Sequence, residues 1–180
     1  MKNTALLLFL FIGCFQAHSQ KVSTKTGSLK FEASVASFEE VAAENKNTSA
    51  ILETSTGDIA VLALMKGFRF KVALMEEHFN ENYVESDKFP KATFKGKIED
   101  FDSTKLSSSV VIYKVTGDLT LHGKTKKIST TAKISKSGDK ISIVGNFDVK
   151  PEDFAIEIPK IVSKKVADVI KVSFNLSLSK

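Results

Sequence analysis

The feature that most constrains this chain is a strict alternation of apolar and polar side chains that recurs along most of its length. Residues 29–35, 68–74, 92–98 and 141–149 each place an apolar or small side chain at every second position. Successive side chains of a β-strand point to opposite faces, so this pattern is typical of strands with one buried and one solvated face. The alternation predicts an all-β protein of eight or nine strands.

Glycine-containing turn sequences separate the alternating runs. The clearest are Thr56-Gly57-Asp58, His122-Gly123-Lys124 and Ser137-Gly138-Asp139. Glycine supplies the positive φ that tight hairpins need, so consecutive strands are expected to be antiparallel. The chain has no βαβ spacing, linker or low-complexity stretch, and this favours one domain over residues 20–180.

Three stretches interrupt the alternation. Residues 37–47 predict a short helix. Residues 75–87 predict a second one, because Phe79 and Tyr83 are four positions apart and would share one helical face. Residues 151–168 predict a loop with at most one helical turn, and a last strand is expected after it.

An antiparallel sheet of this size with one apolar face closes into a barrel or packs against a second sheet. The chain contains 14 Phe and no Trp, and many of the Phe residues fall at inward positions of different strands. An eight-stranded barrel is wide enough to be filled by side chains or to hold one small ligand. We predict a single antiparallel β-barrel of about eight strands with one or two short helices; a β-sandwich is the alternative.

The first residues have the organisation of a signal peptide. Lys2 precedes an apolar run over residues 5–12 that is too short to span a bilayer, and Ala17-His18-Ser19 supplies small residues where signal peptidase cleaves. We predict a signal peptide over residues 1–19 and a periplasmic or secreted mature protein. A lipoprotein anchored through Cys14 is the alternative.

Composition argues against several classes of function. Cys14 is the only cysteine and would leave with the signal peptide, so neither disulfides nor thiol chemistry are expected. The net charge of +5 comes from lysines spread over the chain with a single arginine, unlike the clustered basic and aromatic residues of nucleic-acid-binding proteins. His78 and His122 are the only histidines after residue 19, too few for a typical zinc site. We expect no cofactor, no metal, no nucleic-acid partner and no transmembrane segment.

Catalysis is not expected either. The sequence has no Gly-x-Ser-x-Gly nucleophile motif and no phosphate-binding glycine loop. The carboxylate pairs Glu39-Glu40 and Glu76-Glu77 are adjacent in sequence, so their side chains diverge in either a strand or a helix. These features predict a binding protein rather than an enzyme.

Three strings resemble motifs of the YceI-like family of exported bacterial proteins. Residues 77–94 are similar to its helical segment, aromatic-Pro pair and Thr-Phe strand. Residues 117–126 resemble its Gly-x-Leu-Thr-x-x-Gly-x-Thr-Lys hairpin, and Asp153-Phe154-Ala155-Ile156 is similar to its Asp-Phe-Gly-Ile string. This chain departs from the family pattern at Ala155, which replaces the usual Gly, and at Pro151, where an Arg is common.

The resemblance implies a lipocalin-like barrel whose lumen accommodates a polyisoprenoid or another long-chain amphiphile. We therefore predict an exported, non-catalytic protein that sequesters or carries such a lipid. The alternative is a barrel with a filled core that acts as an envelope or stress interaction protein without a lipid ligand. The candidate ligand-binding residues are apolar side chains from several segments: Phe68, Phe70, Phe79, Tyr83, Phe89, Phe94, Leu119, Leu121, Phe147 and Phe154.

Overall fold

The structure, a computed structural model, describes residues 21–36 and 38–180. The predicted signal peptide and Cys14 lie outside the described residues. Within them, the strands are β1 (Lys21–Ser34), β2 (Ala42–Glu53), β3 (Asp58–Leu64), β4 (Arg69–Phe70), β5 (Lys91–Ile98), β6 (Val111–Leu121), β7 (Lys124–Ser137), β8 (Lys140–Val149) and β9 (Val166–Leu178). The helical elements are α1 (Ala73–His78), the π-helical turn η2 (Phe79–Tyr83) and the 3-10 turns η1 (Met65–Gly67), η3 (Ser103–Lys105) and η4 (Pro151–Phe154).

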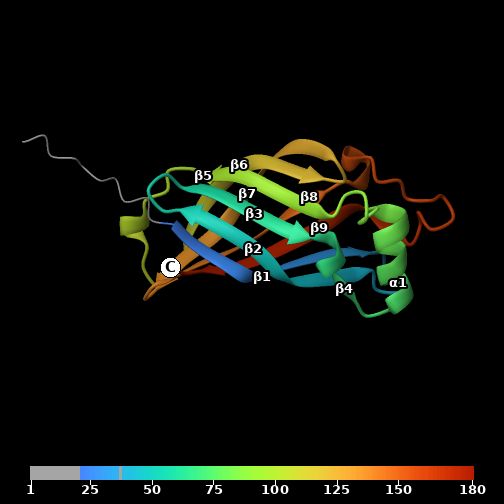
Figure 1. Ribbon diagram of the computed structural model, residues 1–180, viewed down its shortest axis with the longest axis horizontal. Coiled ribbons are helices and arrows are strands. Elements are labelled where there is room, and N and C mark those ends of the chain that lie inside the picture. The colour runs from blue at the N-terminus through green and yellow to red at the C-terminus, as the bar shows by residue number, and fades with distance from the viewer. Residues whose placement is uncertain (1–20, 37) are drawn as a thin grey trace, which may run out of the picture.

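The strands form a closed antiparallel barrel, as predicted (Figure 1). Each long strand pairs with the next along the chain in the order β1-β2-β3-β5-β6-β7-β8-β9, and β9 pairs with β1 to complete the ring. The short β4 adds a ninth strand beside the start of β2. Closure gives every long strand a hydrogen-bonded neighbour on each side over at least part of its length.

The predicted hairpin between β6 and β7 shows why the register is well defined. Leu121 pairs with Lys124, which leaves His122 and Gly123 as a two-residue loop. Both loop residues have positive φ, 49° and 71°. Two-residue loops of this kind match the twist of the flanking strands. The pairing then runs without interruption from Leu121 back to Val111.

The two halves of the barrel differ in how their interior is filled. One half is packed by aliphatic side chains, including Leu52, Ile98 and Ile134, each completely buried. The other half holds a looser cluster around Met65 and Phe68. Helix α1 and the segment 155–165 lie at the end of this second half in Figure 1. Among the described residues, no helix has the length and apolar character needed to cross a membrane.

The helix predicted over residues 37–47 is wrong where the structure describes it. Residues from Ala42 onward belong to β2, which pairs with β1; Ser37 lies outside the described residues. A contact of Asn45 favours a strand over a helix in this segment: the Asn45 side chain is completely buried, and its Nδ2 donates to the carbonyl of Leu64 at 2.9 Å. That contact comes from a distant strand, so local helix propensity is overridden.

The strand predicted over residues 68–74 is also largely wrong. Only Arg69–Phe70 forms a strand, and α1 begins at Ala73. Glu76 explains the change of direction: its carboxylate accepts from the Phe70 backbone N–H at 3.1 Å and from the Arg69 guanidinium at 2.6 Å. The helix predicted over residues 75–87 is present but shorter, and it passes from α-helix into η2 at Phe79.

Candidate ligand-binding site

The loosely packed half of the barrel contains a cavity of about 340 Å³. For comparison, an engineered cavity of about 150 Å³ lined by Leu, Ile and Phe stays dry and accommodates benzene. The walls of the cavity of about 340 Å³ come from strands β1, β3, β5, β6, β8 and β9, from α1 and η2, and from the segment 155–165 that precedes β9. The cavity therefore lies between the barrel interior and the elements at one end of it.

A second cavity of about 80 Å³ continues toward the packed half. The two cavities share five lining residues, which are Leu29, Ala63, Ala92, Leu119 and Phe147. Beyond these, the smaller cavity is bordered by residues of the packed core such as Ile59 and Ile143. Together the cavities form an elongated apolar space that runs along the barrel and ends against the packed core.

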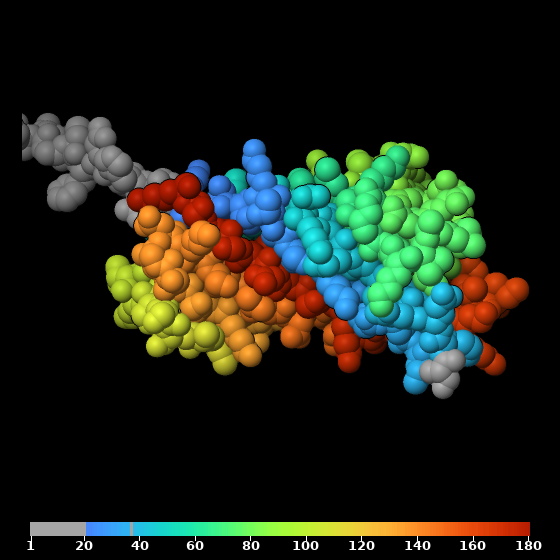
Figure 2. All heavy atoms as spheres, turned by 90° about the horizontal axis from the view of Figure 1, so that it is seen from below, coloured from blue at the N-terminus to red at the C-terminus, as the bar shows by residue number. Residues whose placement is uncertain are grey.

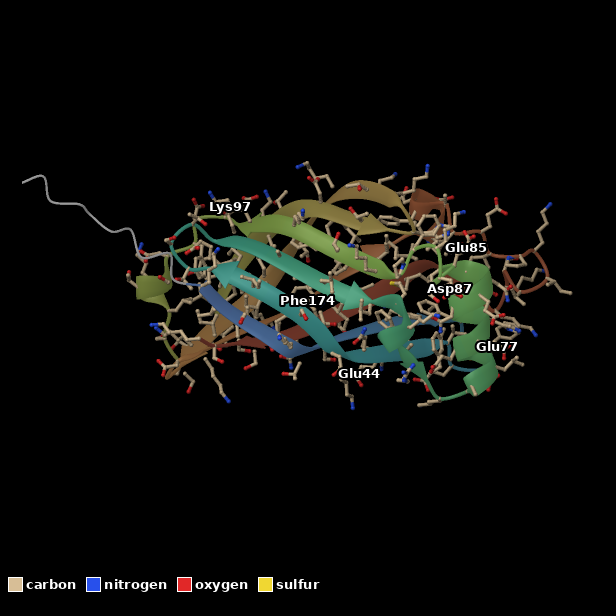
Figure 3. The ribbon with its side chains drawn as sticks, viewed as in Figure 1. Glu44, Glu77, Glu85, Asp87, Lys97 and Phe174 are labelled. Atoms are coloured by element: carbon tan, nitrogen blue, oxygen red, sulfur yellow. The ribbon has the colours of Figure 1, made fainter. Side chains whose placement is uncertain are left out.

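Glycines shape the wall of the smaller cavity. Gly96 of β5 pairs with Gly117 of β6, and the ring of Phe94 lies across both. A Cβ atom on either glycine would come within 2.6 Å of the Phe94 Cζ atom. Gly145 and Phe174 repeat the arrangement on β8 and β9, where a Cβ would lie 2.5 Å from the Phe174 Cζ atom. Figure 3 shows Phe174 on its strand in the middle of the barrel.

Four aromatic rings form a continuous cluster on the wall of the larger cavity. Phe31 of β1 stacks on Phe79 of η2 with ring centroids 5.4 Å apart. Phe68 and Phe70 contact the same two rings at centroid distances of 5.2 to 5.8 Å. Such tilted and offset pairs add to the stabilisation from burial alone. The cluster joins the first strand to the α1–η2 segment and so holds the helix against the barrel.

The chemical character of the larger cavity is almost entirely apolar. Of the described residues that line it, only His78, Tyr83 and Lys165 carry polar side-chain groups. His78 and Lys165 are solvent-exposed residues at the open end. The described residues include no group of three or more His, Cys, Asp or Glu that could hold a metal. The arrangement suits an apolar chain, with polar groups only where that chain would emerge.

The sequence-predicted site residues divide into three groups. Phe94 lines only the smaller cavity, whereas Leu119 and Phe147 line both cavities. Phe89 and Phe154 line neither cavity: Phe89 packs edge-on against His122, and Phe154 is fully buried in η4. Those that line the larger cavity are Phe68, Phe70, Phe79, Tyr83, Leu119, Leu121 and Phe147.

The side chain of His122, in the loop of the β6–β7 hairpin, is only 10% exposed. Its Nδ1 lies 3.0 Å from the Phe154 carbonyl oxygen and its Nε2 lies 2.7 Å from a Glu85 carboxylate oxygen. The bond from His122 holds the pKa of Glu85 below its ordinary value. His122 thus fastens the loop after η2 and the η4 turn to the β6–β7 hairpin.

Sequence reasoning missed several wall residues. Phe31 lies in an alternating run that was correctly predicted as a strand, so its inward position was available from the sequence. Ile158 and Val162 also line the cavity. They belong to an irregular segment without a strand or helix period, and no sequence pattern marks them.

Comparison with known proteins supports the fold. The solved structure of a polyisoprenoid-binding domain from Saccharophagus degradans, implicated in plant cell wall breakdown, matches with a TM-score of 0.76 at 16% identity over 88% of this chain and 97% of that one. Burkholderia cenocepacia BcnA matches with a TM-score of 0.68 at 18% identity, covering 83% and 95% of the two chains. The Campylobacter jejuni YceI protein matches with a TM-score of 0.57 at 21% identity, covering 100% and 99%.

Sequence comparison identifies the family. No curated protein matches this chain significantly. The sequence profile of the YceI-like domain, however, matches residues 15–178, which is nearly the whole chain. The chain therefore belongs to the YceI-like domain family.

Proposed function

We propose that this protein is an exported carrier or sequestering protein that holds one long-chain amphiphile, an isoprenoid or a related lipid, in the barrel. The observation that carries the proposal is the cavity of about 340 Å³, whose described lining is apolar except for three residues and which shares wall residues with the second cavity of about 80 Å³. A polyisoprenoid-binding domain with the same fold supports this choice of ligand class. The sequence features of a signal peptide support export.

Such a ligand would have a defined orientation in the cavity. Each buried methylene contributes about 0.8 kcal/mol, so a hydrocarbon chain is held without any specific hydrogen bond. A polar head group would remain at the open end, where His78 and Lys165 are found, because burying it without partners is costly. The protein then acts by removing an insoluble chain from water rather than by changing it chemically.

A series of prenyl alcohols tests the proposal. Geraniol, farnesol and geranylgeraniol differ only in the number of isoprene units, and binding is measured by displacement of a fluorescent fatty acid. Affinity should rise steeply along the series until the chain fills the cavity, because each added unit buries further hydrocarbon. It should change little with salt, because the ligand carries no charge.

Two substitutions on one strand provide the matched control. Leu121 of β6 lines the cavity, whereas Ile112 on the same strand is 66% exposed on the outer face. Leu121→Gln should weaken farnesol binding about tenfold or more, since it places an unpaired amide against the ligand, and Ile112→Gln should leave binding unchanged. Failure of all three alcohols to bind, or equal affinity for all three, would contradict the proposal and favour a barrel that acts through its outer surface.

A further inference from the structure

Three segments surround the open end of the larger cavity, and each also has a side that faces solvent. Figure 2 shows the connection between β1 and β2, the α1 region and the segment 155–165 gathered at one end of the molecule. Each segment contributes to the cavity wall: Val41 from the first, Met75 from the second, and Ile158 and Val162 from the third. We call these three segments the mouth rim.

Each segment of the mouth rim also exposes one large apolar side chain to solvent. Phe38 between β1 and β2 is 47% exposed, Leu74 of α1 is 56% exposed, and Ile161 is 87% exposed. Ile161 is the most exposed of the large hydrophobic residues described. None of the three lines either cavity. Apolar side chains placed around an opening in this way are available to an external partner rather than to the ligand inside.

The charges of the mouth rim favour an anionic partner at segment 155–165. Lys160, Lys164 and Lys165 form no ion pair with any described residue. Glu157 is the acidic residue of that segment. In the rest of the rim, Glu39 and Glu77 form no ion pair with a described residue, and Lys71–Glu40 and Arg69–Glu76 are paired. The unpaired positive charge is therefore concentrated around Ile161.

We propose that the mouth rim docks on the surface of an anionic lipid bilayer, with Phe38, Leu74 and Ile161 inserted at the interface and Lys160 and Lys164 at the head groups. Apolar residues flanked by lysines bind membrane surfaces through buried area and attraction to anionic lipids. A flat partner touches all three segments at once and brings the cavity opening against the bilayer. The proposal rests on the proposed function, because an amphiphile stored in the barrel would pass between the bilayer and the cavity through this opening.

Flotation with lipid vesicles tests the docking surface separately from the cavity. The protein should bind vesicles of phosphatidylglycerol and phosphatidylcholine, and bind less to vesicles of phosphatidylcholine alone. Ile161→Ser should weaken vesicle binding about tenfold, the equivalent of about two methylene groups withdrawn from the interface. Lys160→Gln together with Lys164→Gln should reduce the preference for the anionic vesicles and its dependence on salt.

Ile112→Ser is the matched control, because Ile112 is also exposed but lies nine positions before Leu121 on β6, about 30 Å along the strand. It should leave vesicle binding unchanged, and both serine variants should bind farnesol in solution as the unmodified protein does. Farnesol binding without vesicle binding, or equal loss from Ile161→Ser and Ile112→Ser, would overturn the docking proposal and leave the cavity proposal standing. A rim that instead joins two copies of this chain would give a concentration-dependent dimer that does not bind vesicles, which would also overturn it.

Discussion

Enlarging one alanine in the cavity wall should stabilise this protein, whereas the same change in its packed half should destabilise it. Ala63 of β3 is 2% exposed, lines both cavities and pairs with Ala92 of β5. Ala63→Leu adds three carbon atoms that extend into empty space instead of into neighbouring atoms. At about 0.8 kcal/mol for each carbon, the upper limit of the gain in unfolding free energy is about 2 kcal/mol.

Ala50 of β2 is the matched control. It is 1% exposed and belongs to the aliphatic cluster that fills the other half of the barrel. Ala50→Leu should cost about 1–3 kcal/mol, because added methylenes in a filled core force side chains and backbone to shift. The two variants carry the same chemical change at buried strand positions. The sign of the change in unfolding free energy therefore shows whether there is unfilled volume beside the substituted residue.

Urea and thermal unfolding of the lipid-free protein measure the effect. A gain of about 2 kcal/mol corresponds to a rise in Tm of about 4–8 °C for a domain of this size. Farnesol affinity should fall by up to about thirtyfold in the Ala63→Leu variant, because the leucine occupies volume that the ligand would fill. If Ala63→Leu destabilises the protein as much as Ala50→Leu and leaves farnesol binding unchanged, the cavity does not exist in solution as described.

Further predictions concern the contacts that hold the end of the barrel and the processing of the chain. His122→Ala should lower the unfolding free energy measured in urea by about 1–3 kcal/mol, because two partly buried hydrogen bonds are lost; an unchanged midpoint would argue against a role of His122 in joining these segments. The folded-state pKa of Glu85 is lowered below its ordinary 4.5, first by the bond from His122, so its stabilising effect is present above pH 4.5 and is lost as the pH falls through the lowered pKa. Glu85→Gln should flatten this part of the Tm profile, and a profile that superimposes on that of the unmodified protein would contradict the assignment. Mass analysis of the exported protein should give Gln20 as the first residue, whereas a diacylated Cys14 would show the lipoprotein route.

Most strands of this fold can be predicted from the sequence, because the alternation of apolar and polar residues within a strand indicates both the strand and its buried face. In β5 and β8 the alternating residues that were expected to face inward, such as Phe94 and Phe147, do line the cavities. The hairpin at His122 and Gly123 was likewise determined by local turn chemistry. Burial of one sheet face could be inferred as well, but that requirement alone left both a barrel and a sandwich possible. The abundance of Phe favoured the barrel.

What the sequence did not reveal depends on contacts between distant segments. Asn45 is held in β2 by the Leu64 carbonyl, and Phe70 is turned toward α1 by Glu76. Phe89 was included among the candidate ligand-binding residues as one of several apolar side chains, yet its ring packs against His122, 33 positions later in the chain. Helix and strand propensities depend on the local sequence and carry no information about these contacts. The predictions therefore failed where contacts with distant residues determine the conformation.

The division of the barrel into a packed and a hollow half has an energetic consequence. Removing packed atoms costs about 24 cal/mol for each Å³ of cavity left behind. The half of the barrel that contains the cavity of about 340 Å³ therefore lacks packing contacts that the aliphatic half makes. The aliphatic cluster in the other half should therefore contribute more to the stability of the ligand-free protein than the hollow half does. If the proposed hydrocarbon ligand binds, it would restore contacts that the empty cavity lacks, and occupancy should raise Tm.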